Sequence, residues 1–192
     1  MRGGLLAFLA LLSASPWAIT VAGTPLSEHR IDSPRANAGF SLRVALVRTL
    51  TGRFDYLEGV IVRDAARQRF SVDVRLAVLS LYMANPEHAR WAQSAEFFDA
   101  ERHPWIRFYA EDVPEAVLHE GGLLHGELSL RGQTRAASFE IDPPACERPG
   151  EDCPVLAHGE IKRSEFGMGA RRLVVSDTVR LRLGIRLRET AP

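Results

Sequence analysis

The side chains that could carry out chemistry are few and widely separated in this sequence. No H-E-x-x-H motif and no histidine pair at helical spacing occurs among the candidate metal ligands, which are His29, His88, His103, His119, His125 and Glu111. Ser94 and Ser164 are the candidate nucleophilic serines, but neither lies in a G-x-S-x-G elbow. We therefore expect no metal, no cofactor and no catalytic residue, and we do not expect an enzyme.

Two further polar positions invite a structural interpretation. Ser164 precedes Gly167 by three residues, and we expect its hydroxyl to hydrogen-bond to backbone in a turn there. Arg163 and Asp177 could form a structural ion pair or a polar gate, and the sequence leaves both readings open.

Charge gives no sign of a nucleic-acid partner. Basic and acidic residues number 24 each, and Lys162 is the only lysine. The arginines are scattered singly rather than clustered, which favours a compositional bias over a phosphate-binding site.

Cys146 and Cys153 flank a loop rich in proline and glycine. In an oxidising compartment they would pair, and so short a ring would stabilise the fold by about 2.5 kcal/mol in the chain-entropy model. A redox or metal role is the alternative, but the spacing is not C-x-x-C and no second ligand pair is near. The prediction is a structural disulfide.

Residues 1–22 have the pattern of a signal peptide. Arg2 supplies the positive start, Leu5 to Leu12 form the apolar stretch, and Thr20-Val21-Ala22 is a suitable cleavage site. The apolar run is shorter than the roughly 20 residues that span a bilayer, although an uncleaved anchor is the alternative. No cysteine lies near the cleavage region, which argues against a lipoprotein. The protein is predicted to be exported.

The elements that must position any site are β-strands. From Val179 to Arg188 apolar residues alternate with arginines, apart from Gly184, so one face of the strand is dry and the other is wet. Such strands are typical of antiparallel sheets in sandwiches and barrels. Similar alternation marks other strands, at residues 40–46, 50–54, 70–78, 106–108, 124–130, 137–141 and 157–162, with an apolar patch at 60–62.

Two local features interrupt this rhythm. Asn85-Pro86-Glu87 is a good helix start, so a short helix is predicted from about Pro86 to Gln93. Gly126 interrupts an apolar face, where glycine marks either a bend in the sheet or room for a ligand.

Three cassettes occur in order along the chain. They are Ser94-x-x-Phe97-Phe98-Asp99 followed by His103-Pro104; Gly126-x-Leu128-x-Leu130-x-Gly132-x-Thr134; and Lys162-Arg163-Ser164-x-Phe166-Gly167 followed by Val175-Ser176-Asp177-x-Val179. Together with the signal peptide they make the chain similar to the YceI-like family of bacterial periplasmic, polyisoprenoid-binding proteins. Several polar positions of the family are replaced here, by Arg35, Ala36 and Val44 among others.

The resemblance implies an all-β fold: an extended eight-stranded antiparallel lipocalin-like β-barrel with one short helix, over residues 28–189. It also implies a periplasmic protein whose partner is an apolar lipid, an isoprenoid of quinone or polyprenyl type, with transient membrane contact. An eight-stranded barrel either fills its interior with side chains or holds one ligand.

The candidate lining residues are apolar and are expected to point inward. The alternative for each of these residues is that it packs in the hydrophobic core without contacting a ligand. They are Phe40, Leu42, Phe54, Val72, Val74, Trp91, Phe97, Phe98, Phe108, Leu128, Phe139, Leu181 and Leu183. Two hypotheses follow: a lipid carrier, or a periplasmic interaction or stress-response module whose barrel is filled by its own side chains.

Overall fold

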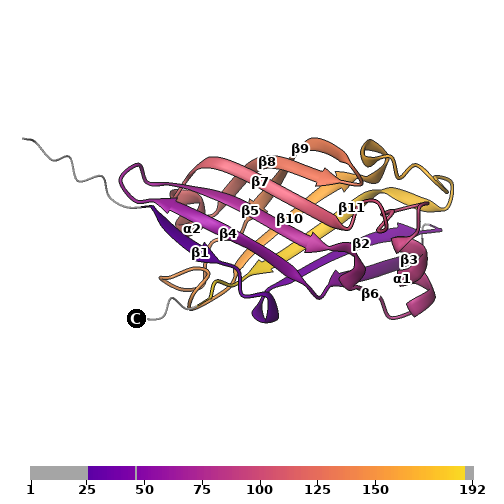
Figure 1. The fold of residues 1–192 in the computed structure, drawn as a ribbon, viewed down its shortest axis with the longest axis horizontal. Helices are drawn as coiled ribbons and strands as arrows, with labels where there is room; N and C mark the ends of the chain where they lie inside the picture. The colour runs from indigo at the N-terminus through magenta and orange to yellow at the C-terminus, as the bar shows by residue number, and fades with distance from the viewer. Residues whose placement is uncertain (1–25, 46, 189–192) are drawn as a thin grey trace, which may run out of the picture.

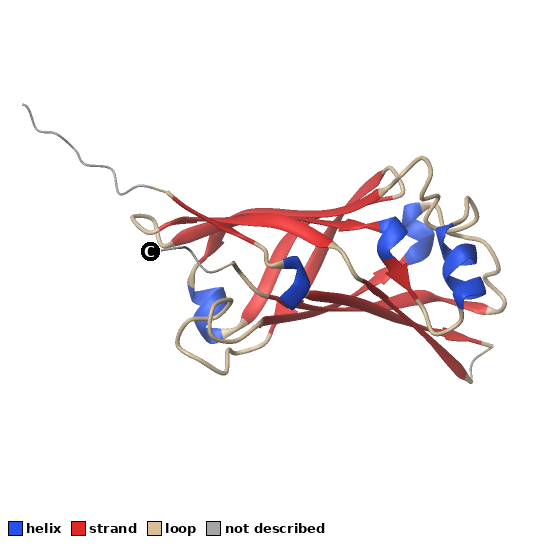
Figure 2. Cartoon of the chain, turned by 60° about the horizontal axis from the view of Figure 1, so that its bottom comes forward, coloured by secondary structure: helices blue, strands red, loops and turns tan. Residues whose placement is uncertain are grey.

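The computed structural model describes residues 26–45 and 47–188, so the predicted signal peptide lies outside the described residues. The fold is all-β and antiparallel, with one sheet curled into a half-barrel. In Figure 2 the strands form the long wall of the molecule and short helices lie around it. The sheet order is β1-β4-β5-β7-β8-β9-β10-β11-β2-β3-β6.

Eleven strands make up this sheet rather than the eight expected. Their bounds are β1 Ser27–Arg30, β2 Asn37–Val44, β3 Arg48–Phe54, β4 Leu57–Asp64, β5 Arg69–Ala77, β6 Leu81–Tyr82, β7 Trp105–Pro114, β8 Gly122–Leu130, β9 Gln133–Ile141, β10 Val155–Lys162 and β11 Val175–Ile185. The edge strands β1 and β6 are short, and β1 is polar, so neither shows apolar alternation. Main-chain pairing to β4 and β3 defines them instead.

The opening of the half-barrel lies between the edge strands β1 and β6, which pair with β4 and β3 and not with each other. Ser33 bridges part of it, since its hydroxyl accepts from the Leu57 N–H at 3.0 Å. Further along, the residues after β1 bond to the residues after β11: the Asp32 N–H donates to the Arg186 carbonyl at 2.8 Å. These hydrogen bonds connect the two sides of the opening, where no further strand is present among the described residues.

Two α-helices mark the two ends of the molecule (Figure 1). The helix α1, Pro86–Gln93, has the predicted bounds, and the Asn85 side chain accepts from the Glu87 N–H at 2.9 Å as expected of an N-cap. The helix α2, Ala116–Glu120, was not predicted because five residues are too few to show a helical period. The 3₁₀ helices are η1 Ser33–Arg35, η2 Val78–Ser80 and η3 Arg163–Phe166.

The predicted disulfide is confirmed. Cys146 and Cys153 are bonded, with their Cα atoms 6.0 Å apart, in the loop between β9 and β10. Their loop packs on the end of the chain that follows β11, because the Gly150 carbonyl accepts from the Leu187 N–H at 2.8 Å. The bond therefore fastens the α2 end of the half-barrel.

The alternation predicted for the last strand is present, although β11 ends at Ile185. Val179 and Ile185 are buried, whereas Arg180 and Arg182 are exposed. Leu187 is also buried, and it forms an isolated bridge with Ile31 rather than a continuation of the strand. The buried apolar faces of the strands other than β1 join a single hydrophobic core inside the half-barrel.

Candidate functional site

The interior of the half-barrel contains an apolar cavity of about 110 Å³ near α1. We call it the α1-side cavity. Its walls come from both halves of the sheet, from α1 and from the segments that follow α1 and η3. The lining residues are Ala38, Gly39, Phe40, Leu42, Leu50, Phe54, Val74, Leu76, Met83, His88, Trp91, Ala92, Phe97, Phe98, Ile106, Phe108, Leu128, Leu130, Phe139, Ile161, Arg163, Met168, Val175, Val179, Leu181 and Leu183.

A second apolar cavity, of about 70 Å³, lies toward α2. We call it the α2-side cavity. Its lining is entirely hydrocarbon: Ile61, Phe70, Val72, Val74, Phe108, Leu118, Leu124, Phe139, Ile141, Val155, Ala157, Leu183 and Ile185. Val74, Phe108, Phe139 and Leu183 border both cavities, so these residues form the wall between them.

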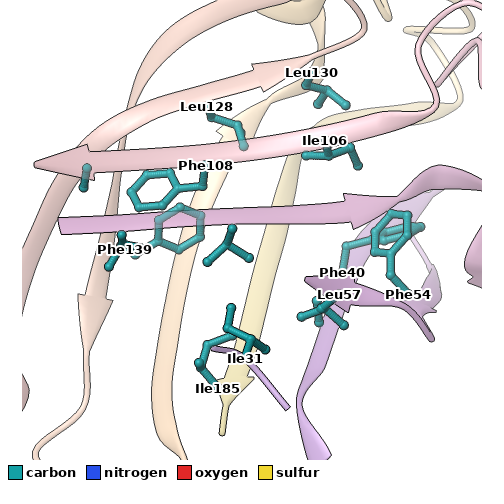
Figure 3. Packing of buried hydrophobic residues seen from close by; sticks show 14 of the residues in the cluster. Ile31, Phe40, Phe54, Leu57, Ile106, Phe108, Leu128, Leu130, Phe139 and Ile185 are labelled. Atoms are coloured by element: carbon teal, nitrogen blue, oxygen red, sulfur yellow. The ribbon is translucent and has the colours of Figure 1, made fainter. Parts of the chain in front are cut away.

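Phe108 and Phe139 are the largest part of that wall. Their ring centroids are 5.0 Å apart and the rings meet edge to face, at 81°. Figure 3 shows the two rings facing each other beneath Leu128. Edge-to-face contact is a favourable arrangement for aromatic pairs. The pair therefore divides the lumen into two compartments.

Two glycines make room for these rings. A Cβ at Gly126 would lie 2.6 Å from Cζ of Phe108 and 2.4 Å from the Tyr109 carbonyl oxygen. A Cβ at Gly159 would lie 3.1 Å from Cδ1 of Phe139. The space at Gly126 is taken by the chain's own Phe108 ring and Tyr109 carbonyl, so this glycine makes no room for a ligand in the present packing.

The rim of the α1-side cavity lies between α1 and the β2–β3 hairpin. Leu42 and Leu50 are paired across that hairpin, and both are half-buried. Trp91 on α1 is also half-buried, and its ring meets Phe97 at 4.4 Å between centroids. Phe98 is likewise half-buried and packs against Phe40 at 6.1 Å. These apolar side chains bring the cavity close to solvent on this side.

A polar clasp fixes Trp91 at the rim. Its indole N–H donates to Glu96 at 2.9 Å, and Arg171 donates to the other carboxylate oxygen of Glu96 at 2.8 Å. The Arg171 guanidinium and then the Trp91 indole lower the pKa of Glu96, so the carboxylate stays charged. The clasp joins the segment after α1 to the loop before β11.

Arg163 is a buried charged residue at this end of the lumen, with 2% of its surface exposed. Its guanidinium donates to four backbone carbonyls, those of Met168, Ala170, Val175 and Ser176. Burial lowers the pKa of Arg163. Arg163 thus holds together the loop 167–174 that connects η3 to β11.

Asp177 bonds to Ser164. The Ser164 hydroxyl donates to Oδ2 at 2.7 Å and its N–H donates to Oδ1 at 2.9 Å. Burial acts to raise the pKa of Asp177, but the two bonds from Ser164 and the positive charges of Arg163 and Arg172 together outweigh it, so the pKa lies below its ordinary value. The prediction that the Ser164 hydroxyl bonds to backbone was wrong, because the carboxylate is the stronger acceptor within reach. Arg163 and Asp177 are each bound to other groups, which favours neither of the readings open for them.

The structure places every predicted lining residue on a cavity wall. Val72 borders the α2-side cavity, and the others border the α1-side cavity. That they contact a ligand stays a prediction. Met83, Met168 and His88 also line the α1-side cavity and were missed, because they lie in turns or on α1 where alternation gives no signal.

Polar chemistry is scarce along these walls. Among the described residues, His88 and Arg163 are the polar side chains that border the α1-side cavity. Across residues 26–45 and 47–188, no group of three or more His, Cys, Asp or Glu side chains is placed to hold a metal ion. Within the same ranges no helix has the length and apolar character to cross a bilayer. The arrangement is suited to holding hydrocarbon.

Comparison with known proteins gives a family and a fold. A family model described as a YceI-like domain matches residues 29–187. No curated protein matches the chain. A polyisoprenoid binding domain from Saccharophagus degradans implicated in plant cell wall breakdown has a similar structure, with 16% identity over 84% of this chain and 97% of that chain and a TM-score of 0.63.

Two other solved structures are similar. BcnA from Burkholderia cenocepacia is 18% identical over 81% of this chain and 98% of its own, with a TM-score of 0.66. The YCEI protein of Campylobacter jejuni is 22% identical over 72% of this chain and 85% of its own, with a TM-score of 0.58. At these identities the likeness shows the fold. The family model covers most of the chain, and this protein belongs to the YceI-like domain family.

Proposed function

We propose that this protein binds the hydrocarbon chain of an isoprenoid lipid, of quinone or polyprenyl type, in the lumen of its half-barrel and carries it in the periplasm. The observation that carries the proposal is the α1-side cavity, which is almost wholly apolar and reaches a half-exposed apolar rim. The disulfide and the family fit an exported protein. The similar domain from Saccharophagus degradans is described as polyisoprenoid-binding.

Binding of this kind needs no covalent step. Relative to water, a hydrocarbon chain held in an apolar lumen gains about 25 cal/mol per Å² of surface removed from water, whereas its transfer from bilayer to lumen is close to neutral because both are apolar. Burial of roughly a few hundred Å² outweighs the cost of ordering the chain and gives affinity of about micromolar strength. The half-barrel supplies the apolar surface, and the rim between α1 and the β2–β3 hairpin supplies the entrance.

The size of the cavities sets a condition on this mechanism. Pockets for small molecules usually measure about 300–1,000 Å³, and an apolar cavity of about 150 Å³ holds a single benzene. The two cavities here measure about 110 and 70 Å³. A long chain must therefore displace side chains as it enters, and Met83 and Met168 are suited to that because methionine repacks easily.

The same observation favours a second candidate function. A lumen divided by Phe108 and Phe139 and filled mostly by side chains suits an interaction or stress-response module that takes no cargo. In that case the apolar interior is ordinary core. The two functions differ in whether an isoprenoid binds with saturation, which the following titration measures.

Fluorescence of single-tryptophan variants tests the proposal. Trp91 lines the α1-side cavity, whereas Trp105 lies on the outer face beside Tyr56 at 6.1 Å between ring centroids. We expect a short-chain ubiquinone to quench the Trp105→Phe variant, which retains Trp91, with saturation near micromolar quinone. The Trp91→Phe variant serves as the matched control and should show only weak, non-saturating quenching. Both are expressed from residue 23 onward, so that Trp17 is absent. Equal, linear quenching of both variants contradicts cargo binding.

A further inference from the structure

The loops beside the cavity rim expose apolar side chains at their tips. Val47, at the turn between β2 and β3, has 86% of its surface exposed. Leu173 has 101% exposed and Val174 has 51%, in the loop between η3 and β11. Apolar side chains at such full exposure, grouped at one end of a molecule, mark a contact surface.

The two loops lie side by side. The Ala45 N–H donates to the Val174 carbonyl at 2.7 Å, and Val44 pairs with Val175. Figure 1 shows the β2–β3 turn and the segment between η3 and β11 at the same end of the molecule as α1. We call residues 43–45 and 47–48 together with residues 167–174 the docking loops.

Arginines surround these apolar tips. Arg43 and Arg48 are exposed on the hairpin, and Arg171 and Arg172 are exposed on the neighbouring loop. The sequence has no acidic residue within either 43–48 or 167–174. Two carboxylates lie nearby: Glu96 pairs with Arg171, and Asp177, which is bound to Ser164, also attracts Arg172. The docking loops therefore present a local positive charge on a protein whose overall charge is zero.

We propose that the docking loops bind the surface of a bilayer rich in anionic lipids, and that this contact places the cavity rim at the membrane. This proposal rests on the proposed function, because membrane contact serves to bring the lipid to the cavity. Apolar side chains that enter the headgroup region, combined with arginines that attract anionic headgroups, are the two signals that give reversible membrane binding.

The position of the docking loops relative to the cavity rim supports a bilayer as their binding partner. Leu42 and Leu50, which line the α1-side cavity, are on the same hairpin as Val47. Arg171 reaches Trp91 through Glu96. A protein partner would need an interface of roughly 1,200–2,000 Å², whereas separate tips with few side chains suit insertion between lipids. An isoprenoid could then pass from bilayer to lumen without crossing water.

Vesicle co-sedimentation tests the surface. The disulfide-bonded protein is mixed with vesicles of phosphatidylglycerol and phosphatidylcholine, and separately with phosphatidylcholine alone. We expect binding to the anionic vesicles that weakens as salt rises, and at least about ten-fold weaker binding to the neutral ones. Val47→Asp with Leu173→Asp should reduce binding to anionic vesicles at least about ten-fold. Arg48→Glu with Arg172→Glu should remove the salt dependence.

The matched control places the same charges elsewhere. Leu123 and Leu156 are exposed on β8 and β10, and Leu123→Asp with Leu156→Asp should leave vesicle binding unchanged. If the control weakens binding as much as Val47→Asp with Leu173→Asp does, the assigned surface is wrong. If the unmodified protein is a dimer that the Val47 and Leu173 changes convert to a monomer, the surface binds a second copy and the membrane proposal is overturned.

The quinone titration separates this proposal from the function on which it rests. We expect the Val47 and Leu173 changes to leave saturable quenching of Trp91 intact, because neither side chain lines a cavity. Saturable quenching without binding to anionic vesicles overturns the docking surface and leaves the proposed function standing. Vesicle binding that needs Val47 and Leu173, without saturable quenching, supports the surface and contradicts cargo binding.

Discussion

Replacement of Arg163 by methionine is expected to lower the free energy of unfolding by about 3 to 5 kcal/mol. Methionine fills similar space without a donor, so the carbonyls of Met168, Ala170, Val175 and Ser176 lose their partner together. Leaving a buried polar group unpaired costs about 1 to 3 kcal/mol, and the losses do not add fully because the loop relaxes. Urea unfolding followed by circular dichroism measures the change.

Arg163→Lys is the control for this prediction. Lysine keeps the positive charge but cannot span four carbonyls with a planar fork, so we expect it to recover only part of the lost stability. A methionine variant within about 1 kcal/mol of the unmodified protein would show that Arg163 is not what holds the loop 167–174 in place.

Replacement of Phe139 by alanine is expected to join the two cavities and to shift binding toward longer chains. In the present packing Phe139 and Phe108 divide the lumen, so a short isoprenoid has to displace side chains only around the α1-side cavity, whereas a long one must also move the two rings. We expect the affinity for solanesol relative to farnesol to rise about ten-fold, which corresponds to about 1.4 kcal/mol. The cavity left behind should lower the free energy of unfolding by about 3 to 5 kcal/mol.

Two further variants make this result interpretable. Phe139→Leu removes the ring at a smaller cost in stability and should shift the preference in the same direction. Phe54→Ala also enlarges the α1-side cavity, but Phe54 does not border the α2-side cavity. We therefore expect Phe54→Ala to change the affinities for farnesol and solanesol by the same factor. If Phe139→Ala and Phe54→Ala change the farnesol-to-solanesol ratio equally, the ring pair does not set the usable length of the lumen.

Much of the wall was predictable from the sequence because alternation encodes which face of a strand is dry. The strands β5 and β11 were located in this way, and α1 was located by its N-cap and proline. The short edge strands β1 and β6 could not be predicted in this way. β1 has a polar sequence and β6 has two residues, so only main-chain bonds to β4 and β3 make them strands. The opening between the edge strands β1 and β6 is likewise a property of pairing that no local pattern records.

The candidate site was predictable in its residue types and not in its shape. Phe108 and Phe139 were expected to point inward, but their contact depends on which strands become neighbours and on the glycines that seat them. Arg163 could not be recognised as a buried residue, since arginine is almost never fully buried unless it is paired. Its partners are carbonyls of a loop with no pattern of its own.

Mass spectrometry of an organic-solvent extract from natively expressed protein tests the central claim most directly. The protein is purified from the periplasm without detergent, with its disulfide intact, and the extract is compared with that of Phe54→Ala purified in the same way. We predict an isoprenoid lipid in an amount comparable to the protein, and no less of it with Phe54→Ala, because that change enlarges the α1-side cavity. A lipid-free extract from folded protein would contradict the account and favour a half-barrel filled by its own side chains.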